Sequence, residues 1–309
     1  MGTRTDRRGF IRQASMWAVG LGGAVAGVSP AAAIPPIGRT RPSQIKLSLA
    51  AYSFRKYLQA KENPMTLFDF IDLCADLRLD GTEPTSYYFP SDVTAEYLAQ
   101  IKRRAFVLGL DISGTAIRND FCVPPGEKRD SEIAHVKKWV DYAAQFGAGT
   151  IRIFSGSVSK GHTLEEAQTW FVECAEETCA YAGQKGVFLA LENHGGISVS
   201  ADLLLTLLER VKSPWFGINL DTGNFHTADP YDDMARVAPY AVNVQVKTEV
   251  GPGENRVPAD FDRIIAILRD AKYSGYVALE YEAREDPKTA VPREIERLRE
   301  ALANAGVGR

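Results

Sequence analysis

The stretch VFLALENHGG, residues 187–196, decides the fold and gives the first candidate site residues. Five consecutive apolar residues lead directly into Glu192, which is followed by Asn193, His194 and two glycines. A short, continuous apolar run is typical of a strand that is buried on both faces, as in a parallel sheet. A carboxylate and an imidazole at the end of such a strand indicate the rim of a site.

Three later stretches show the same arrangement, an apolar run with polar residues at its end: FGINLDTGNFH (216–226), with Asp221 and His226; AVNVQVKTE (241–249), with Gln245 and Lys247; and YVALEYE (276–282), with Glu280 and Glu282. A single strand that ends in a charged residue is common. Four successive strands of this kind predict a barrel in which the polar side chains meet at one mouth.

The first 33 residues have the features of an export signal. Arg7 and Arg8 precede Gly9-Phe10-Ile11, a weakly apolar stretch runs from Ala14 to Val28, and Ala31–Ala33 suit signal peptidase. This segment resembles a twin-arginine signal, which predicts the twin-arginine translocase as a partner and a periplasmic or other extracytoplasmic location. An ordinary secretory signal or a basic tail is the alternative.

The remaining residues, 34–309, are close to the roughly 250-residue size of one (β/α)₈ barrel. A hydrophobic content of 45% is enough for a large core, whereas a formal charge of −3 gives no basic surface for nucleic acid. The four cysteines form no CxxC pair, so we expect buried free thiols. Whether the chain forms a homo-oligomer is left open.

Apolar and amphipathic segments alternate along the whole of this region. Candidate strands begin near Ile45, Gly81, Leu110, Thr150, Val187, Gly217, Ala241 and Tyr276, and helical patterns cover 66–78, 92–107, 131–146, 164–185, 201–212, 231–238, 260–272 and 292–304. This alternation predicts the α/β class and a single (β/α)₈ TIM barrel. A doubly wound open sheet is the alternative, but the first turn, AYSFRKYL (51–58), has no glycine-rich phosphate loop.

Four polar residues, one from each of the last four strands, form a candidate metal site: Glu192, Asp221, Gln245 and Glu280. Three carboxylates gathered at one mouth repel one another unless a cation neutralises them. Oxygen donors suit Mn²⁺ or Mg²⁺ better than Zn²⁺, so we expect one such divalent ion as cofactor. Each residue has a simpler alternative role: a salt bridge for a glutamate, an Asx-turn for Asp221, and filling of the barrel interior for Gln245.

At these four strands the chain resembles the xylose isomerase-like barrels, the sugar phosphate isomerases and epimerases. Members show a Glu that ends strand five, an Asp in a Leu-Asp-Thr-Gly turn, a His-x-Lys on strand seven and a Glu on strand eight. The matching residues here are Glu192, Asp221, Gln245 with Lys247, and Glu280. Gln245 departs from the pattern because many members place a histidine ligand there. His226 lies five residues after Asp221, whereas many members place a histidine three residues after it.

The resemblance implies a metal-dependent sugar isomerase or epimerase in which Glu192 and Glu280 exchange a proton at a carbon next to a carbonyl group. His194 is an alternative acid or base, and Lys247 is a candidate for binding an oxyanion. Further substrate-binding candidates at strand ends are Glu83, Arg118, Arg152 and His226. If the protein is exported, an unphosphorylated carbohydrate is the expected substrate.

Three other functions are alternatives to the isomerase or epimerase. A metal-dependent lyase that cleaves 3-keto-glycosides by β-elimination uses the same proton abstraction. A non-catalytic sugar-binding protein belongs to a different class and would not need the carboxylates. The endonuclease IV group requires several zinc-binding histidines, and this chain has only four histidines in total.

Overall fold

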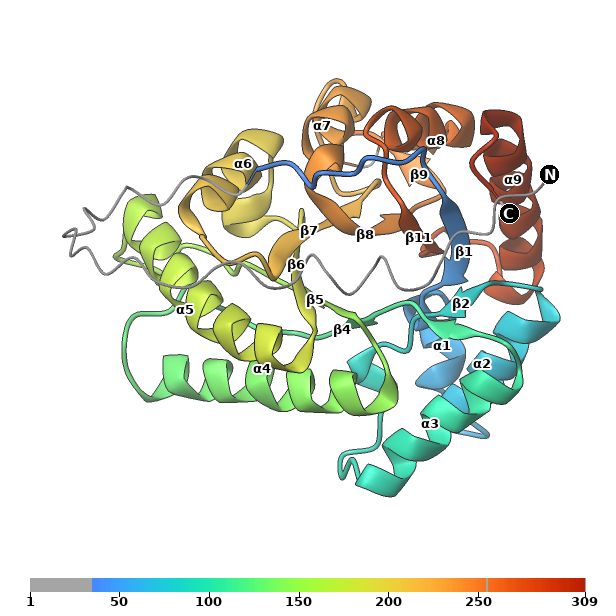
Figure 1. The fold of residues 1–309 in the computed structure, drawn as a ribbon, viewed down its shortest axis with the longest axis horizontal. Helices are drawn as coiled ribbons and strands as arrows, with labels where there is room; N and C mark the ends of the chain where they lie inside the picture. The colour runs from blue at the N-terminus through green and yellow to red at the C-terminus, as the bar shows by residue number, and fades with distance from the viewer. Residues whose placement is uncertain (1–34, 254, 309) are drawn as a thin grey trace, which may run out of the picture. The chain divides into compact units, whose positions relative to one another are not determined.

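The structure is a computed structural model, and it describes residues 35–253 and 255–308. The predicted export signal at 1–33 lies outside these residues. Strands form the centre of the fold and helices surround them (Figure 1). The strands are β1 (Ile45–Leu49), β2 (Gly81–Thr82), β3 (Asp111–Ile112), β4 (Thr115–Ala116), β5 (Thr150–Ile153), β6 (Phe188–Glu192), β7 (Phe216–Asp221), β8 (Ala241–Val246), β9 (Glu249–Val250), β10 (Val257–Pro258) and β11 (Gly275–Leu279).

Seven of these strands form one parallel sheet in the order β1-β11-β8-β7-β6-β5-β4. A second parallel pair, β2 with β3, connects the two ends of this sheet. On one side, Ala50 and Glu83 form a parallel bridge from β1 to β2. On the other side, β3 and β4 are two halves of one strand that is interrupted at Ser113-Gly114. The strands therefore close into a barrel.

The helices are α1 (Arg55–Leu58), α2 (Leu67–Asp76), α3 (Ala95–Val107), α4 (Glu127–Phe146), α5 (Leu164–Lys185), α6 (Ala201–Arg210), α7 (Pro230–Val237), α8 (Phe261–Asp270) and α9 (Pro287–Ala305). From α2 onward, one α-helix follows each barrel strand. Local sequence fixes several of their ends. Thr163 and Glu166 form a capping box at the start of α5, and Gly186 ends that helix in a left-handed conformation.

The predicted single (β/α)₈ barrel is confirmed, and the open-sheet alternative is wrong because the strands close on themselves. The predicted helices agree with the observed ones, although α4 and α9 begin four and five residues earlier than expected. All four cysteines are buried and free, as expected.

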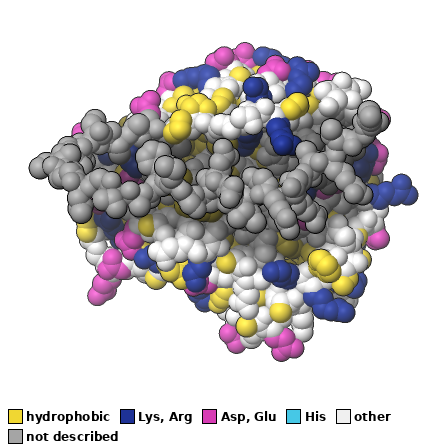
Figure 2. Space-filling view, viewed as in Figure 1, with side chains coloured by type: hydrophobic (Ala, Val, Ile, Leu, Met, Phe, Trp, Pro, Cys, Tyr) yellow, Lys and Arg dark blue, Asp and Glu magenta, His cyan; other side chains and the backbone are white. Residues whose placement is uncertain are grey.

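On the face shown in Figure 2, acidic and basic side chains are interspersed over the described part of the surface. Within the described residues, none of the helices is both long enough and apolar enough to span a membrane.

Candidate active site

A cavity of about 970 Å³ opens at the carboxyl ends of the barrel strands. Residues from the ends of seven strands line it, including Tyr52 after β1, Tyr87 after β2, Arg118 after β4, Phe154 after β5, Glu192 at the end of β6, Lys247 after β8 and Glu280 after β11. In a parallel barrel this is the end at which loops gather side chains from many strands around one space. The cavity is therefore the candidate active site.

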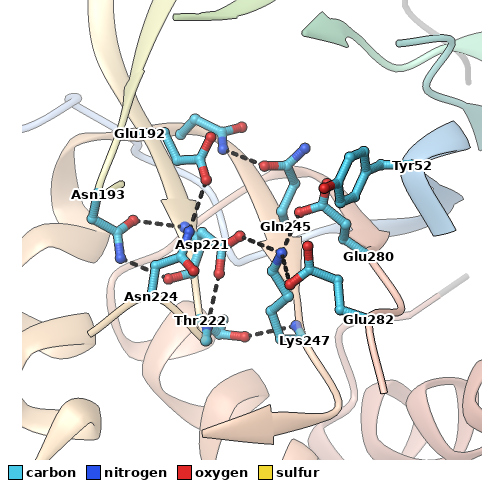
Figure 3. A network of polar contacts seen from close by, with 12 residues as sticks. Tyr52, Glu192, Asn193, Asp221, Thr222, Asn224, Gln245, Lys247, Glu280 and Glu282 are labelled. Carbon is cyan, nitrogen blue, oxygen red and sulfur yellow. Dashed lines mark hydrogen bonds and ion pairs between the residues drawn. The ribbon is translucent and has the colours of Figure 1, made fainter. Parts of the chain in front are cut away.

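The ammonium group of Lys247 lies among three carboxylates at the floor of this cavity (Figure 3). Its Nζ atom is 2.7 Å from Glu280 Oε2, 2.9 Å from Glu282 Oε2 and 3.3 Å from Asp221 Oδ2. Lys247, Asp221 and Glu280 are buried, whereas Glu282 is partly exposed. Because buried carboxylates need a nearby positive charge, Lys247 is the cation that allows these three to gather.

The turn after β7 fixes the Asp221 carboxylate. Its Oδ1 atom accepts a hydrogen bond of 2.8 Å from the backbone NH of Gly223, which is the Asx-turn considered as its alternative role. Asn193, at the end of the neighbouring strand, brackets the backbone of Asp221: its Oδ1 accepts from the Asp221 NH, and its Nδ2 donates to the Asp221 carbonyl. A buried side-chain amide therefore holds the ends of β6 and β7 together.

Glu192 has a separate cationic partner. The Nε atom of Arg152 lies 2.8 Å from Glu192 Oε2, and both side chains are almost completely buried. Asn224 donates a hydrogen bond of 2.8 Å to the other carboxylate oxygen. Arg152 also donates to the hydroxyl group of Tyr87 at 3.2 Å, and its guanidinium group stacks on Phe154. These contacts fix Glu192 at the cavity wall.

Gln245 belongs to a hydrogen-bonded network inside the barrel. Its Oε1 atom accepts from Asn219 at 2.7 Å, and its Nε2 atom donates to Glu83 at 2.7 Å. Asn243 donates to both Glu83 and Asn219. All four side chains are buried, and the cavity lining includes none of them. Gln245 therefore fills the barrel interior in this structure, which is the alternative role considered for it.

Burial and charge shift the pKa values of these carboxyl groups in different directions. Burial raises the pKa of Glu83 to about 7, and it also raises the pKa of Glu192 and of Asp221. Burial acts in the same direction on Glu280, but the attraction of Lys247 outweighs it and the pKa of Glu280 is lowered. Glu192 and Glu280 thus differ in proton affinity although both line one cavity.

The outer wall of the cavity is aromatic and basic. The rings of Tyr52 and Tyr87 meet edge to face, with 6.4 Å between their centroids. The guanidinium group of Arg55 lies 4.8 Å from the centroid of Tyr52, and that of Arg118 lies 5.6 Å from the centroid of Tyr87. Sugar-binding sites commonly combine such aromatic surfaces with forked donors.

The two candidate histidines lie in different places. His194 lines the cavity, and its ring is 4.3 Å from the ring of Phe154. His226 is exposed and outside the cavity lining, where its Nδ1 atom lies 3.3 Å from the carbonyl oxygen of Gly251. The structure therefore brings His194 to the site, together with Arg118, Arg152, Glu192, Lys247 and Glu280, but not His226.

Glu282 lies at the mouth, as its place at the end of the last strand predicted, although no role was assigned to it. Other site residues were not predicted: Asn224 and Arg55 contact or line the site, and Asn219 and Asn243 lie beneath it. Side chains alternate along a strand, so residues two positions apart face the same side. This rule places Asn219 with Asp221, and Asn243 with Gln245, and it is the sequence signal that could have identified the two asparagines.

Known structures share this architecture. A D-psicose 3-epimerase from Clostridium cellulolyticum H10, solved with D-tagatose, has a TM-score of 0.67 and 16% identity; the match covers 85% of this chain and 100% of that one. The 3-keto-D-glucoside 4-epimerase from E. coli has a TM-score of 0.67 and 14% identity, covering 83% and 100%. A probable 3-DHS dehydratase from Bacillus anthracis has a TM-score of 0.64 and 20% identity, covering 82% and 98%.

Because these three structures share only 14–20% sequence identity with this chain, their similarity establishes the fold alone. No curated protein matches the sequence. The profile of one family, described as "Xylose isomerase-like TIM barrel", matches residues 68–301, which is most of the chain. This match, together with the closed parallel barrel and the polar residues at its strand ends, shows that the chain belongs to the xylose isomerase-like TIM barrel family.

Proposed function

We propose that this protein is a carbohydrate isomerase or epimerase that moves a proton at a carbon next to a carbonyl group. The observation behind this proposal is the placement of two carboxyl groups in one cavity, each beside its own cation. Glu192 pairs with Arg152, and Glu280 pairs with Lys247. Two of the compared structures are sugar epimerases, which agrees with this assignment.

The chemistry follows from these contacts. Lys247 and Arg152 are placed to stabilise the negative charge that develops on the carbonyl oxygen when the neighbouring carbon loses a proton. Glu280, which Lys247 keeps ionised, takes that proton, and an enediolate forms. Glu192, whose pKa is raised by burial, starts the reaction protonated and donates its proton from another side of the cavity, since β7 and β8 lie between its strand β6 and β11. Delivery to the opposite face of the same carbon gives an epimer, and delivery to the former carbonyl carbon gives an isomer. Exchange of protons with solvent then restores both carboxyl groups.

The resemblance to the family implies a Mn²⁺ or Mg²⁺ ion held by Glu192, Asp221, Gln245 and Glu280. The arrangement of these residues does not fit that ion. Gln245 Oε1 accepts from Asn219, Glu192 is paired with Arg152, and the ammonium group of Lys247 lies between Asp221 and Glu280. Within the described residues, the His, Cys, Asp and Glu side chains form no group placed to hold a metal. No step of the proposed mechanism therefore passes through a metal.

A lyase reaction is the second candidate, and the position of His194 favours it. The same proton abstraction would be followed by loss of a leaving group, and His194 lines the cavity where it could protonate that group. One of the compared structures is a probable dehydratase. A sugar-binding protein without turnover is the remaining alternative, and the experiment below separates the three.

The proposed substrate is an extracytoplasmic, unphosphorylated carbohydrate. This part of the proposal rests on the twin-arginine-like sequence around Arg7 and Arg8, because exported enzymes meet mainly unphosphorylated sugars. The translocase would then be a transient partner of the precursor.

The test is an incubation of the purified protein with a panel of ketoses and 3-keto-glycosides in D₂O. We expect deuterium to enter the carbon next to the carbonyl group of at least one sugar, as detected by NMR, together with an epimer or isomer. An unsaturated product would assign the lyase reaction instead. Sugar binding measured by calorimetry without any exchange would assign the non-catalytic role and contradict the proposed one.

A further inference from the structure

The outer wall of the cavity contains two arginines with no acidic partner. Arg55 and Arg118 both line the cavity, and no carboxylate of the described residues lies within 4.0 Å of either guanidinium group. The other two cations of the lining, Arg152 and Lys247, are already paired with buried carboxylates. The positive charge at the outer wall is therefore available to a ligand.

We propose that Arg55 and Arg118 form a subsite for the carboxylate of an acidic sugar, such as a uronate. This inference rests on the proposed function, since it specifies the substrate class of the same cavity. A guanidinium group presents a planar fork of donors that matches a carboxylate and can bind it through two parallel hydrogen bonds. A neutral sugar would leave both charges without a counterpart.

Contacts with the two tyrosines place both arginines at this wall, and hydrogen bonds fix Arg55 more firmly than Arg118. Arg55 lies over Tyr52, Tyr52 meets Tyr87 edge to face, and Arg118 lies over Tyr87. Arg55 also donates to the backbone carbonyl oxygens of Tyr52 and Tyr281 at 3.3 and 3.1 Å, and both of these bonds come from Nη1. Its Nε and Nη2 groups remain for a ligand. Binding to side chains that are already ordered costs less conformational entropy.

The charge distribution also sets the orientation of the substrate. Glu280, Glu282 and Asp221 gather around the buried Lys247 at the floor, whereas Arg55 and Arg118 are more exposed and belong to the outer wall. Asp120 also lines the cavity, but its carboxylate has its own cation, Lys128, at 3.9 Å. A ligand carboxylate would be repelled by the floor and attracted to the wall. An acidic sugar would consequently bind with its carboxylate at the wall and its carbonyl group toward Lys247 and Glu280. Tyr87 links the outer wall to the Arg152–Glu192 pair, because its ring contacts Arg118 and its hydroxyl group accepts a hydrogen bond from Arg152.

The experiment compares three probes by calorimetry: D-glucuronate, its neutral methyl ester and glucose 6-sulfate. We expect glucuronate to bind about tenfold or more tightly than the ester, because hydrogen bonds between charged groups are stronger than those to a neutral ester. Arg55→Gln and Arg118→Gln should each remove most of this preference, because each weakens the binding of glucuronate far more than that of the ester. Arg118→Lys should retain part of it, since the charge remains but the fork is lost.

Arg269→Gln is the matched control, because this arginine lies on α8, pairs with Asp270 and is outside the cavity lining. Circular dichroism melting of each variant verifies that the barrel is intact. Equal affinity of the wild-type protein for glucuronate and its ester would overturn the inference. Tighter binding of glucose 6-sulfate than of glucuronate would overturn the carboxylate assignment.

The binding measurement is independent of the proposed reaction. If glucuronate binds through the two arginines but no sugar exchanges deuterium, the subsite stands and the isomerase function fails. If neutral ketoses exchange deuterium and the Arg55→Gln and Arg118→Gln variants bind glucuronate like the wild type, the function stands and the subsite fails.

Discussion

At the residue scale, the site depends on one lysine. Lys247 is the cationic partner of Asp221, Glu280 and Glu282 at once, and it is almost completely buried. The attraction of these carboxylates outweighs the effect of burial and raises its pKa well above the usual value, so the ammonium form is retained. A divalent ion bound between Asp221 and Glu280 would have to displace the ammonium group of Lys247.

Lys247→Gln should therefore change the metal affinity of the protein. Without the ammonium group, Asp221 and Glu280 are left without their cation, and Mn²⁺ becomes a favourable replacement. We expect Mn²⁺ to raise the melting temperature of the variant but not that of the wild type, and elemental analysis should find bound metal only in the variant. A wild-type protein that retains one Mn²⁺ or Mg²⁺ per chain through dialysis would instead support the metal site that the family resemblance implies.

Glu280→Gln tests proton transfer at the other end of the same ion pair. The amide has nearly the size of the carboxylate but cannot take a proton, so turnover should fall by roughly 10²-fold or more, which is typical of a lost general base. Deuterium exchange measured by NMR is the readout, with sugar binding followed by calorimetry. Glu285→Gln serves as control, because Glu285 pairs with Arg293 outside the cavity lining. Full activity of Glu280→Gln would move the search for the base to His194.

At the element scale, the turn after β7 positions Lys247, which directly follows the neighbouring strand β8. A Cβ atom added to Gly223 would lie 2.5 Å from Lys247 Cγ and 2.7 Å from Lys247 Cβ, which is too close for any real contact. The glycine thus lets the Lys247 stem pack directly against the turn that holds Asp221.

Gly223→Ala should accordingly push the Lys247 side chain away from its carboxylates without removing any charged group. We expect a clear loss of activity while the far-ultraviolet circular dichroism spectrum stays that of a folded barrel. Gly149→Ala is the matched control, since a Cβ atom there meets nothing within 4 Å. If both variants were equally active, the close packing of Lys247 on this turn would have no functional role.

The elements were predictable from the sequence because each has a strong local signal. The continuous apolar run at 187–191 predicts β6, and capping residues such as Thr163 mark helix starts. The interruption of the third strand at Ser113-Gly114 was not predictable, because it depends on which strands pair on either side. The sequence left two roles open for Gln245, a metal ligand and a filler of the barrel interior. Its partners Asn219 and Glu83 come from other strands, so local sequence could not decide between the two.

At the scale of the whole molecule, the export hypothesis concerns a segment outside the described residues. Arg7→Lys combined with Arg8→Lys should retain the precursor in the cytoplasm, because the twin-arginine pathway requires the arginine pair. Cell fractionation and immunoblotting would detect this. As a control, the Lys46→Arg variant, in which the change lies outside the predicted signal and within β1, should be exported normally. Normal export of the double variant would indicate the general secretory pathway.

The pairing of the first barrel strand with the last has a consequence for biosynthesis. β1 pairs with β11 along its whole length, with Ile45 opposite Gly275 and Leu49 opposite Leu279. The backbone NH of Ile45 also donates a hydrogen bond to the carbonyl oxygen of Val307. While the chain is still being made on the ribosome, β1 has no strand to pair with on that side until β11 has emerged. Closure of the barrel therefore waits for β11, and the site at its mouth is completed only after Lys247 and Glu280 have also been made.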